Sequence, residues 1–106
     1  MITPASPDDV FSIDKPSVVV VTNNLTCAPC RALKPHLDKA MGAFTDDIDF
    51  IEVDIMGEAH MIDIAAELGV TATPTLLYTK DGSEFEPIVS RTTLPLIEEI
   101  NAFVNP

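Results

Sequence analysis

The stretch Val18-Val19-Val20-Val21, followed six residues later by Cys27-Ala28-Pro29-Cys30, decides how the rest of this chain is interpreted. Four consecutive β-branched residues predict a strand that is buried on both faces of a sheet. The two cysteines are the only two in the 106 residues, and they stand where a helix is expected to begin. Two thiols at this spacing, in a chain with no others, usually take part in a reaction.

The residues that follow the first cysteine have helical periodicity. Leu33, Leu37 and Met41 recur at intervals of four and predict an amphipathic helix. A thiol at the N-terminus of a helix faces unpaired backbone N–H groups and the positive end of the helix dipole, which favour the thiolate. We therefore expect Cys27 to be the catalytic nucleophile. Cys30 lies one helical turn further on nearly the same side, so it is expected to be the resolving thiol.

The rest of the chain alternates between strand and helix patterns. Strands are expected at 2–3, 48–55, 75–78 and 85–90, and helices at 8–13, 58–68 and 93–104. The predicted buried side of the 58–68 helix consists of Met61, Ile62, Ala65 and Leu68, and Thr93 is the predicted N-cap of the last helix. This order predicts an α/β fold with a central mixed sheet of about four to five strands, flanked by helices on both faces. The length favours a single domain over residues 1–106.

The charge of the chain restricts its partners. Seventeen acidic residues against six basic ones give a formal net charge of −11. Such a charge repels phosphate backbones and anionic lipids, so neither nucleic acid nor a membrane surface is an expected partner. The N-terminal residues lack the basic and apolar segments of a signal peptide, and we expect a cytoplasmic monomer. Because the cytosol keeps thiols reduced, the cysteine pair indicates a redox or metal role rather than a structural disulfide.

A metal site is the alternative to redox chemistry at the two cysteines. Zinc needs about four ligands, and the candidate set of Cys27, Cys30, His36 and His60 lacks the spacing of a zinc finger. We therefore expect no metal, and we interpret the two histidines as surface or helix-end residues.

Several motifs together resemble the thioredoxin family. The residues that carry the resemblance are Cys27-Ala28-Pro29-Cys30, Pro35, Val53-Asp54, Thr73-Pro74-Thr75-Leu76-Leu77 and Asp81-Gly82. The resemblance spans residues 18–104. It implies the thioredoxin fold and a protein-disulfide reductase, in which Cys27 attacks a substrate disulfide and Cys30 resolves the mixed disulfide.

The resemblance also implies a binding surface and partners. It implies a cis peptide bond between Thr73 and Pro74, with the backbone of Thr73 pairing with a substrate strand. Pro29 and Arg91 complete the expected substrate-binding residues. No cofactor is expected to be bound. Electrons would come from NADPH through a thioredoxin reductase, and the clients would be disulfide-containing proteins, with ribonucleotide reductase as a demanding example.

Three departures from the family pattern are visible. Val21 stands where many thioredoxins have a buried Asp, and Phe50 stands where a Lys commonly lies opposite it. We therefore expect Cys30 to lose its proton to water or to the leaving sulfur. The segment 22–26 is more similar to glutaredoxins, and the chain has no Trp. Ser90 and Arg91 stand where a Gly is common in the family. Arg91 either lies near Cys27, where it stabilises the thiolate or steers an anionic group, or it is a surface residue without a role.

Two alternatives from other classes stay open. One is a glutaredoxin-like reductant coupled to glutathione, which the 22–26 segment favours and Pro35 disfavours. The other is a thioredoxin-fold accessory subunit that has no catalytic need for its cysteines.

Overall fold

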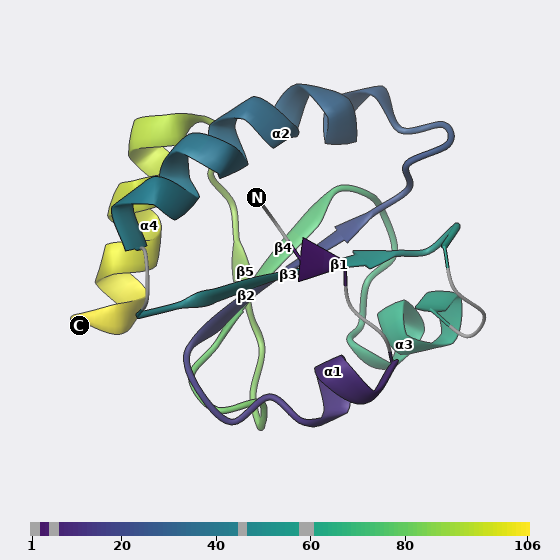
Figure 1. The fold of residues 1–106 in the computed structure, drawn as a ribbon, viewed down its shortest axis with the longest axis horizontal. Coiled ribbons are helices and arrows are strands. Elements are labelled where there is room, and N and C mark those ends of the chain that lie inside the picture. The colour runs from purple at the N-terminus through teal and green to yellow at the C-terminus, as the bar shows by residue number, and fades with distance from the viewer. Residues whose placement is uncertain (1–2, 5–6, 45–46, 58–60) are drawn as a thin grey trace.

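The described residues form one five-stranded sheet with helices on both faces. The computed structural model describes residues 3–4, 7–44, 47–57 and 61–106. The strands are β1 (Thr3–Pro4), β2 (Ser17–Thr22), β3 (Asp49–Asp54), β4 (Thr75–Thr79) and β5 (Glu86–Ile88). The helices are α1 (Pro7–Phe11), α2 (Ala28–Met41), α3 (Met61–Glu67) and α4 (Thr93–Val104), and a 3-10 turn, η1 (Gly42–Phe44), follows α2. Figure 1 shows this arrangement.

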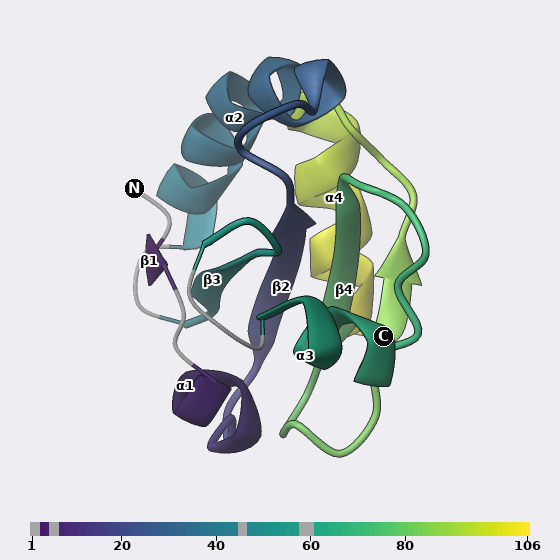
Figure 2. The same cartoon turned by 90° about the vertical axis from the view of Figure 1, so that its right-hand side faces the viewer.

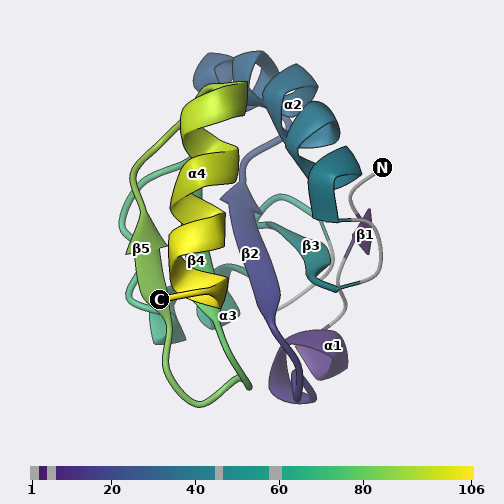
Figure 3. The same cartoon turned by 90° about the vertical axis from the view of Figure 1, so that its left-hand side faces the viewer.

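The sheet is mixed, as the sequence predicts. Its strand order is β1-β3-β2-β4-β5. Strand β3 pairs in parallel with β1 and β2, whereas β4 runs antiparallel to both β2 and β5. Helices α2 and α4 cover one face of the sheet, and α1 and α3 cover the other (Figures 2 and 3). The carboxyl ends of β2, β3 and β5 therefore meet at one end of the molecule, where β4 begins.

Strand β2 is the centre of the sheet, and all six of its residues are buried. Val18 and Val20 pack into the core beneath α2 and α4, whereas Val19 and Val21 pack into the core beneath α1 and α3. Because both faces of this strand are covered by helices, apolar side chains are favoured on both, which explains the run of four valines.

Helix α2 confirms the periodicity in the sequence. It begins directly after Cys27, and its buried residues are Cys30, Leu33, Leu37 and Ala40. Pro35 lies inside the helix. The same apolar side continues through η1 to Phe44, which is also buried.

The prediction of the buried side of α3 is wrong for one residue. Ile62 is 59% exposed, and Ile64 is buried instead. The buried face of this short helix consists of Met61, Ile64 and Ala65, at the i, i+3, i+4 spacing that one face of a helix requires. Residues 58–60 of the predicted helix lie outside the described residues. Gly69 ends the helix with a φ of 78°, as a C-terminal glycine commonly does.

The last helix begins at the predicted residue, but its N-cap is Thr92 and not Thr93. The hydroxyl of Thr93 lies 2.8 Å from Nδ1 of His36 on α2, and the Thr93 backbone N–H donates to the same nitrogen. The imidazole of His36 thus takes the place of a side-chain cap and ties α4 to α2.

Strand β5 is shorter than predicted. It ends at Ile88, because the next two backbone N–H groups donate to the carboxylate of Glu99 instead of a ladder partner. Strand β1 overlaps the predicted strand at 2–3 in Thr3 and continues to Pro4, and residue 2 lies outside the described residues. In the hairpin between β4 and β5, Gly82 has a φ of 89°, and a Cβ there would meet the carbonyl oxygen of Ile13.

No helix in the described part of the chain combines the length and the apolar composition that a membrane span requires.

Candidate active site

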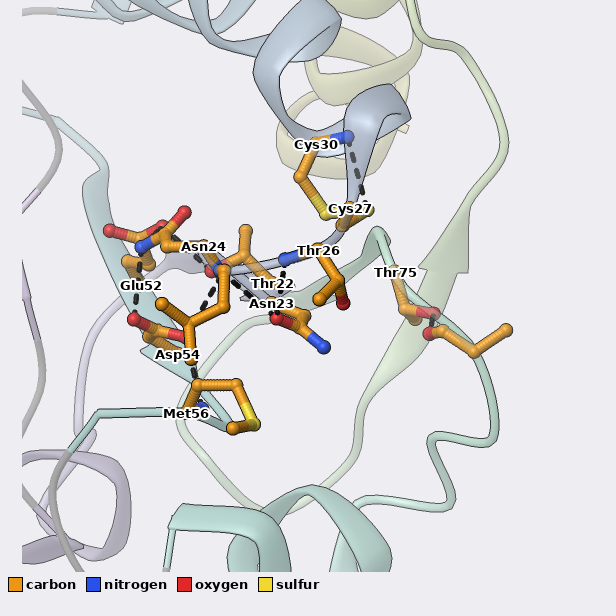
Figure 4. Close-up of a disulfide and its surroundings, with 12 residues drawn as sticks. Thr22, Asn23, Asn24, Thr26, Cys27, Cys30, Glu52, Asp54, Met56 and Thr75 are labelled. Carbon is orange, nitrogen blue, oxygen red and sulfur yellow. Dashed lines mark hydrogen bonds between the residues drawn. A yellow bond between two sulfur atoms is a disulfide. The ribbon is translucent and has the colours of Figure 1, made fainter.

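Cys27 and Cys30 form a disulfide at the start of α2, with 5.2 Å between their Cα atoms (Figure 4). Cys27 is the N-cap of the helix, and the backbone N–H of Cys30 donates to Cys27 Sγ at 3.2 Å. Cys27 is 7% exposed and Cys30 1% exposed, so the cysteine at the helix terminus is the less buried of the two. A backbone donor and the helix dipole at the Cys27 sulfur both favour its thiolate over the thiol. This geometry supports the predicted roles of the two thiols.

The peptide bond between Thr73 and Pro74 is cis, as the resemblance implies. The two residues directly precede β4, in which Thr75 pairs with Val21 of the central strand. Since β2 leads into the cysteine loop, this register places the cis-proline at the same end of the sheet as the disulfide. Figure 4 shows Thr75 on that side. Pro29 lies in the first turn of α2 and is exposed, beside the two cysteines in sequence and space.

The segment before the cysteines is organised by Asn23. Its side-chain Oδ1 accepts hydrogen bonds from the backbone N–H groups of Leu25 and Thr26, and its carbonyl oxygen accepts one from Cys27 N–H. An Asn side chain readily closes such local turns. The Asn-containing segment therefore sets the position from which Cys27 enters the helix.

Two carboxylates on β3 hold the segment before the cysteines: Asp54, which the sequence indicates only as part of the resemblance, and Glu52, which the sequence interpretation missed. Glu52 is 7% exposed, and its Oε2 accepts hydrogen bonds from Thr22 Oγ1 at 2.7 Å and Asn24 Nδ2 at 3.3 Å. The same amide nitrogen donates to Asp54 Oδ2 at 3.0 Å. Asp54 Oδ1 also accepts from the backbone N–H groups of Asn24 and Met56. The carboxylates thus attach the cysteine-bearing loop to β3 (Figure 4).

The predicted relation between Val21 and Phe50 is wrong in one respect. Both side chains are buried and apolar, as expected. However, Val21 pairs with Val53 and faces the α1/α3 core, whereas Phe50 pairs with Val18 and faces the α2/α4 core. Successive side chains alternate between the faces of a strand, so Phe50 does not lie opposite Val21. The buried carboxylate in this region is Glu52, one residue away from the Val53 position.

Arg91 is engaged by its own loop. Its Nη1 donates to the carbonyl oxygens of Ile88 at 2.7 Å and Ser90 at 3.0 Å. Burial lowers the pKa of the guanidinium, and the carboxylate of Glu99 opposes that shift. The hydrogen-bond partners of the Arg91 side chain are thus backbone carbonyl oxygens rather than Cys27. A role of Arg91 in substrate binding stays a prediction.

Within the described ranges, no group of three or more His, Cys, Asp or Glu side chains is placed to hold a metal ion. His36 contacts Thr93 at the start of α4, and His60 lies outside the described residues.

A disulfide that begins a helix, at the same end of this mixed sheet as a cis-proline, is the arrangement of a thioredoxin-fold domain with a dithiol site. The family model described as Thioredoxin matches residues 5–102, and the chain belongs to the thioredoxin family.

The similar proteins are thioredoxins or contain related domains. Thioredoxin-1 of Schizosaccharomyces pombe is 34% identical over 72% of this chain and 70% of its own length. Two relatives from Arabidopsis thaliana match over smaller shares of their length. NADPH-dependent thioredoxin reductase 3 is 35% identical over 60% of this chain, which covers 12% of that protein. Thioredoxin H2 is 38% identical over 59% of this chain, which covers 44% of it.

A solved structure supports the same assignment. Mitochondrial thioredoxin 3 of Saccharomyces cerevisiae, in its oxidised form, superposes with a TM-score of 0.74 at 28% identity. The superposition covers 95% of this chain and 94% of that one.

Proposed function

We propose that this chain reduces disulfides of client proteins by dithiol exchange. The observation that carries the proposal is the Cys27–Cys30 disulfide, in which the less buried cysteine lies at the helix N-terminus. In the reduced protein, the Cys27 thiolate attacks one client sulfur, a mixed disulfide forms, and the other client sulfur leaves as a thiolate. Cys30 then gives up its proton and attacks Cys27 Sγ, which releases the second client thiolate. Two electrons pass to the client, and the Cys27–Cys30 disulfide forms.

Client recognition is proposed to involve the surface around the disulfide. The backbone of Thr73 would pair with an extended client segment, and Pro74 and Pro29 would flank it. A client with a neutral or basic contact surface would suit the negative charge of the chain.

The proposed source of electrons is NADPH through a thioredoxin reductase. This proposal is supported by the similarity to NADPH-dependent thioredoxin reductase 3 of Arabidopsis thaliana, which is 35% identical over 60% of this chain. We further propose a cytoplasmic, monomeric protein, with ribonucleotide reductase as one candidate client. The second candidate reductant is glutathione, because the 22–26 segment carries no Trp and is built by Asn side chains.

Insulin reduction separates the two reductants. The protein is assayed with NADPH and thioredoxin reductase, and separately with NADPH, glutathione and glutathione reductase. We expect turnover in the first system and little in the second. Turnover with glutathione alone would make the chain glutaredoxin-like. Inactivity in both, together with full biological activity of a Cys27→Ser/Cys30→Ser protein, would favour an accessory subunit.

The dependence of the exchange rate on pH is expected to show the thiol titrations and no further ionisation. Val21 supplies no carboxyl group, and Glu52 accepts its hydrogen bonds from Thr22 and Asn24 rather than from a thiol. The measurement is the second-order rate constant of the reduced protein with a disulfide across pH, for wild type and Glu52→Gln. The two profiles should have the same inflections. Loss of an inflection in Glu52→Gln would show that Glu52 accepts the Cys30 proton.

A further inference from the structure

The segment that follows β5 leads toward the end of the sheet at which the cis-proline lies. Ile88, the last residue of β5, pairs with Leu76 of β4 in an antiparallel register. If this register is extended, Val89 falls at the level of Thr75 and Ser90 at the level of Pro74. Figure 2 shows the chain running from β5 to the end of the molecule at which α2 begins, before it turns into α4. The segment 88–91 is therefore part of the rim of the active site.

Two side chains of opposite charge hold this segment. The carboxylate of Glu99 on α4 accepts hydrogen bonds from Val89 N–H at 3.0 and 3.2 Å and from Ser90 N–H at 2.9 Å. Arg91 Nη1 donates hydrogen bonds to the carbonyl oxygens of Ile88 and Ser90. Partial burial would raise the pKa of Glu99, but the hydrogen bonds from these two residues and the charge of Arg91 outweigh it and lower the pKa.

The bonds to Glu99 have a consequence for client binding. Backbone N–H groups at the end of an edge strand can pair with another extended chain. Here the N–H groups of Val89 and Ser90 are occupied from within the molecule, so this side of the site offers no strand pairing through them. What it offers is the side chain of Val89, which is 77% exposed. A large apolar side chain held in solvent, at the same end of the sheet as the disulfide, is suited to contact a partner.

We propose that Glu99 is a positioning residue for client binding, which fixes the 88–91 segment so that Val89 contacts an apolar side chain next to the client's reacting cysteine. This proposal rests on the proposed function. It assigns backbone pairing to the Thr73 side of the site and apolar contact to the Val89 side. Because a small disulfide carries no neighbouring side chain, Glu99 and Val89 affect only the reaction with proteins.

The test compares two substrates of the pre-reduced protein, insulin and bis(2-hydroxyethyl) disulfide, and so needs no reductase. For Glu99→Ala and for Val89→Ser, we expect the second-order rate constant with insulin to fall about tenfold, as for loss of one well-packed contact residue. The rate constant with the small disulfide should stay unchanged. Glu98→Ala is the matched control, because Glu98 is the exposed neighbour of Glu99 on the same helix.

One further measurement and the second variant keep the outcomes distinct. Amide hydrogen exchange at Val89 and Ser90 should accelerate in Glu99→Ala and not in Glu98→Ala. If Glu99→Ala does not fold, Val89→Ser, at an exposed position, decides the proposal. Equal losses with both substrates, or no loss with insulin, would overturn it. Failure of the wild-type protein to reduce either substrate would instead overturn the proposed function.

Discussion

Cys27→Ser abolishes disulfide reduction, whereas Cys30→Ser stops the reaction after the first exchange and leaves the client attached to Cys27. This is the expected result because the cysteine at the helix N-terminus is the less buried one, and a serine hydroxyl in its place provides no thiolate. Without the Cys30 sulfur, the mixed disulfide has no neighbouring thiol to resolve it.

Mass spectrometry of the protein after reaction with a disulfide-containing peptide checks this assignment. Cys30→Ser should gain the mass of one peptide chain, and dithiothreitol should remove it. The matched comparison is Cys27→Ser, which should show no adduct. An adduct on Cys30 in the Cys27→Ser protein, formed as quickly as the one on Cys27, would reverse the roles of the two thiols.

The parts of the fold that could be predicted from the sequence are those that depend on local pattern. The run from Val18 to Val21 is apolar at every position because both faces of β2 are covered, so it identified the central strand without knowledge of its neighbours. The cysteine pair was found in the same way, since it is a short motif with its own geometry. The cis bond of Thr73-Pro74 and its place across from the cysteines were implied by the resemblance to the thioredoxin family.

The contacts around the site could not be predicted, because they depend on register between distant segments. Glu52 is one acidic residue among several in the sequence, and only the pairing of β2 with β3 places it against Thr22 and Asn24. Likewise, Glu99 reaches the end of β5 only because α4 folds back along it. The error over Phe50 has the same origin, since counting residues from a motif does not show which face of the strand a side chain occupies.

Val21→Asp is expected to destabilise the protein severely at neutral pH. Val21 is fully buried in a cluster whose members are all apolar: Val10, Val19, Val53, Met61, Ile64, Ala65 and Leu77. A carboxylate placed there has no partner of opposite charge in the cluster. A pKa raised by about three units by burial corresponds to about 4 kcal/mol of lost stability.

The dependence on pH identifies the cause of this loss. A carboxyl group whose pKa is raised by folding costs nothing extra below its unfolded pKa of about 3.9, and its cost grows as pH rises to the folded pKa. Wild type has the opposite dependence at Glu99, whose lowered pKa means that its contribution to stability is lost as pH falls. The comparison is therefore made at each pH against Val21→Asn, which shares that background and has the same shape without the charge. Urea unfolding should give the two variants similar stability near pH 4 and a gap of about 4 kcal/mol above pH 7. Equal stability at pH 7 would mean that the carboxylate finds a partner, and that Val21 is not required to be apolar by its surroundings.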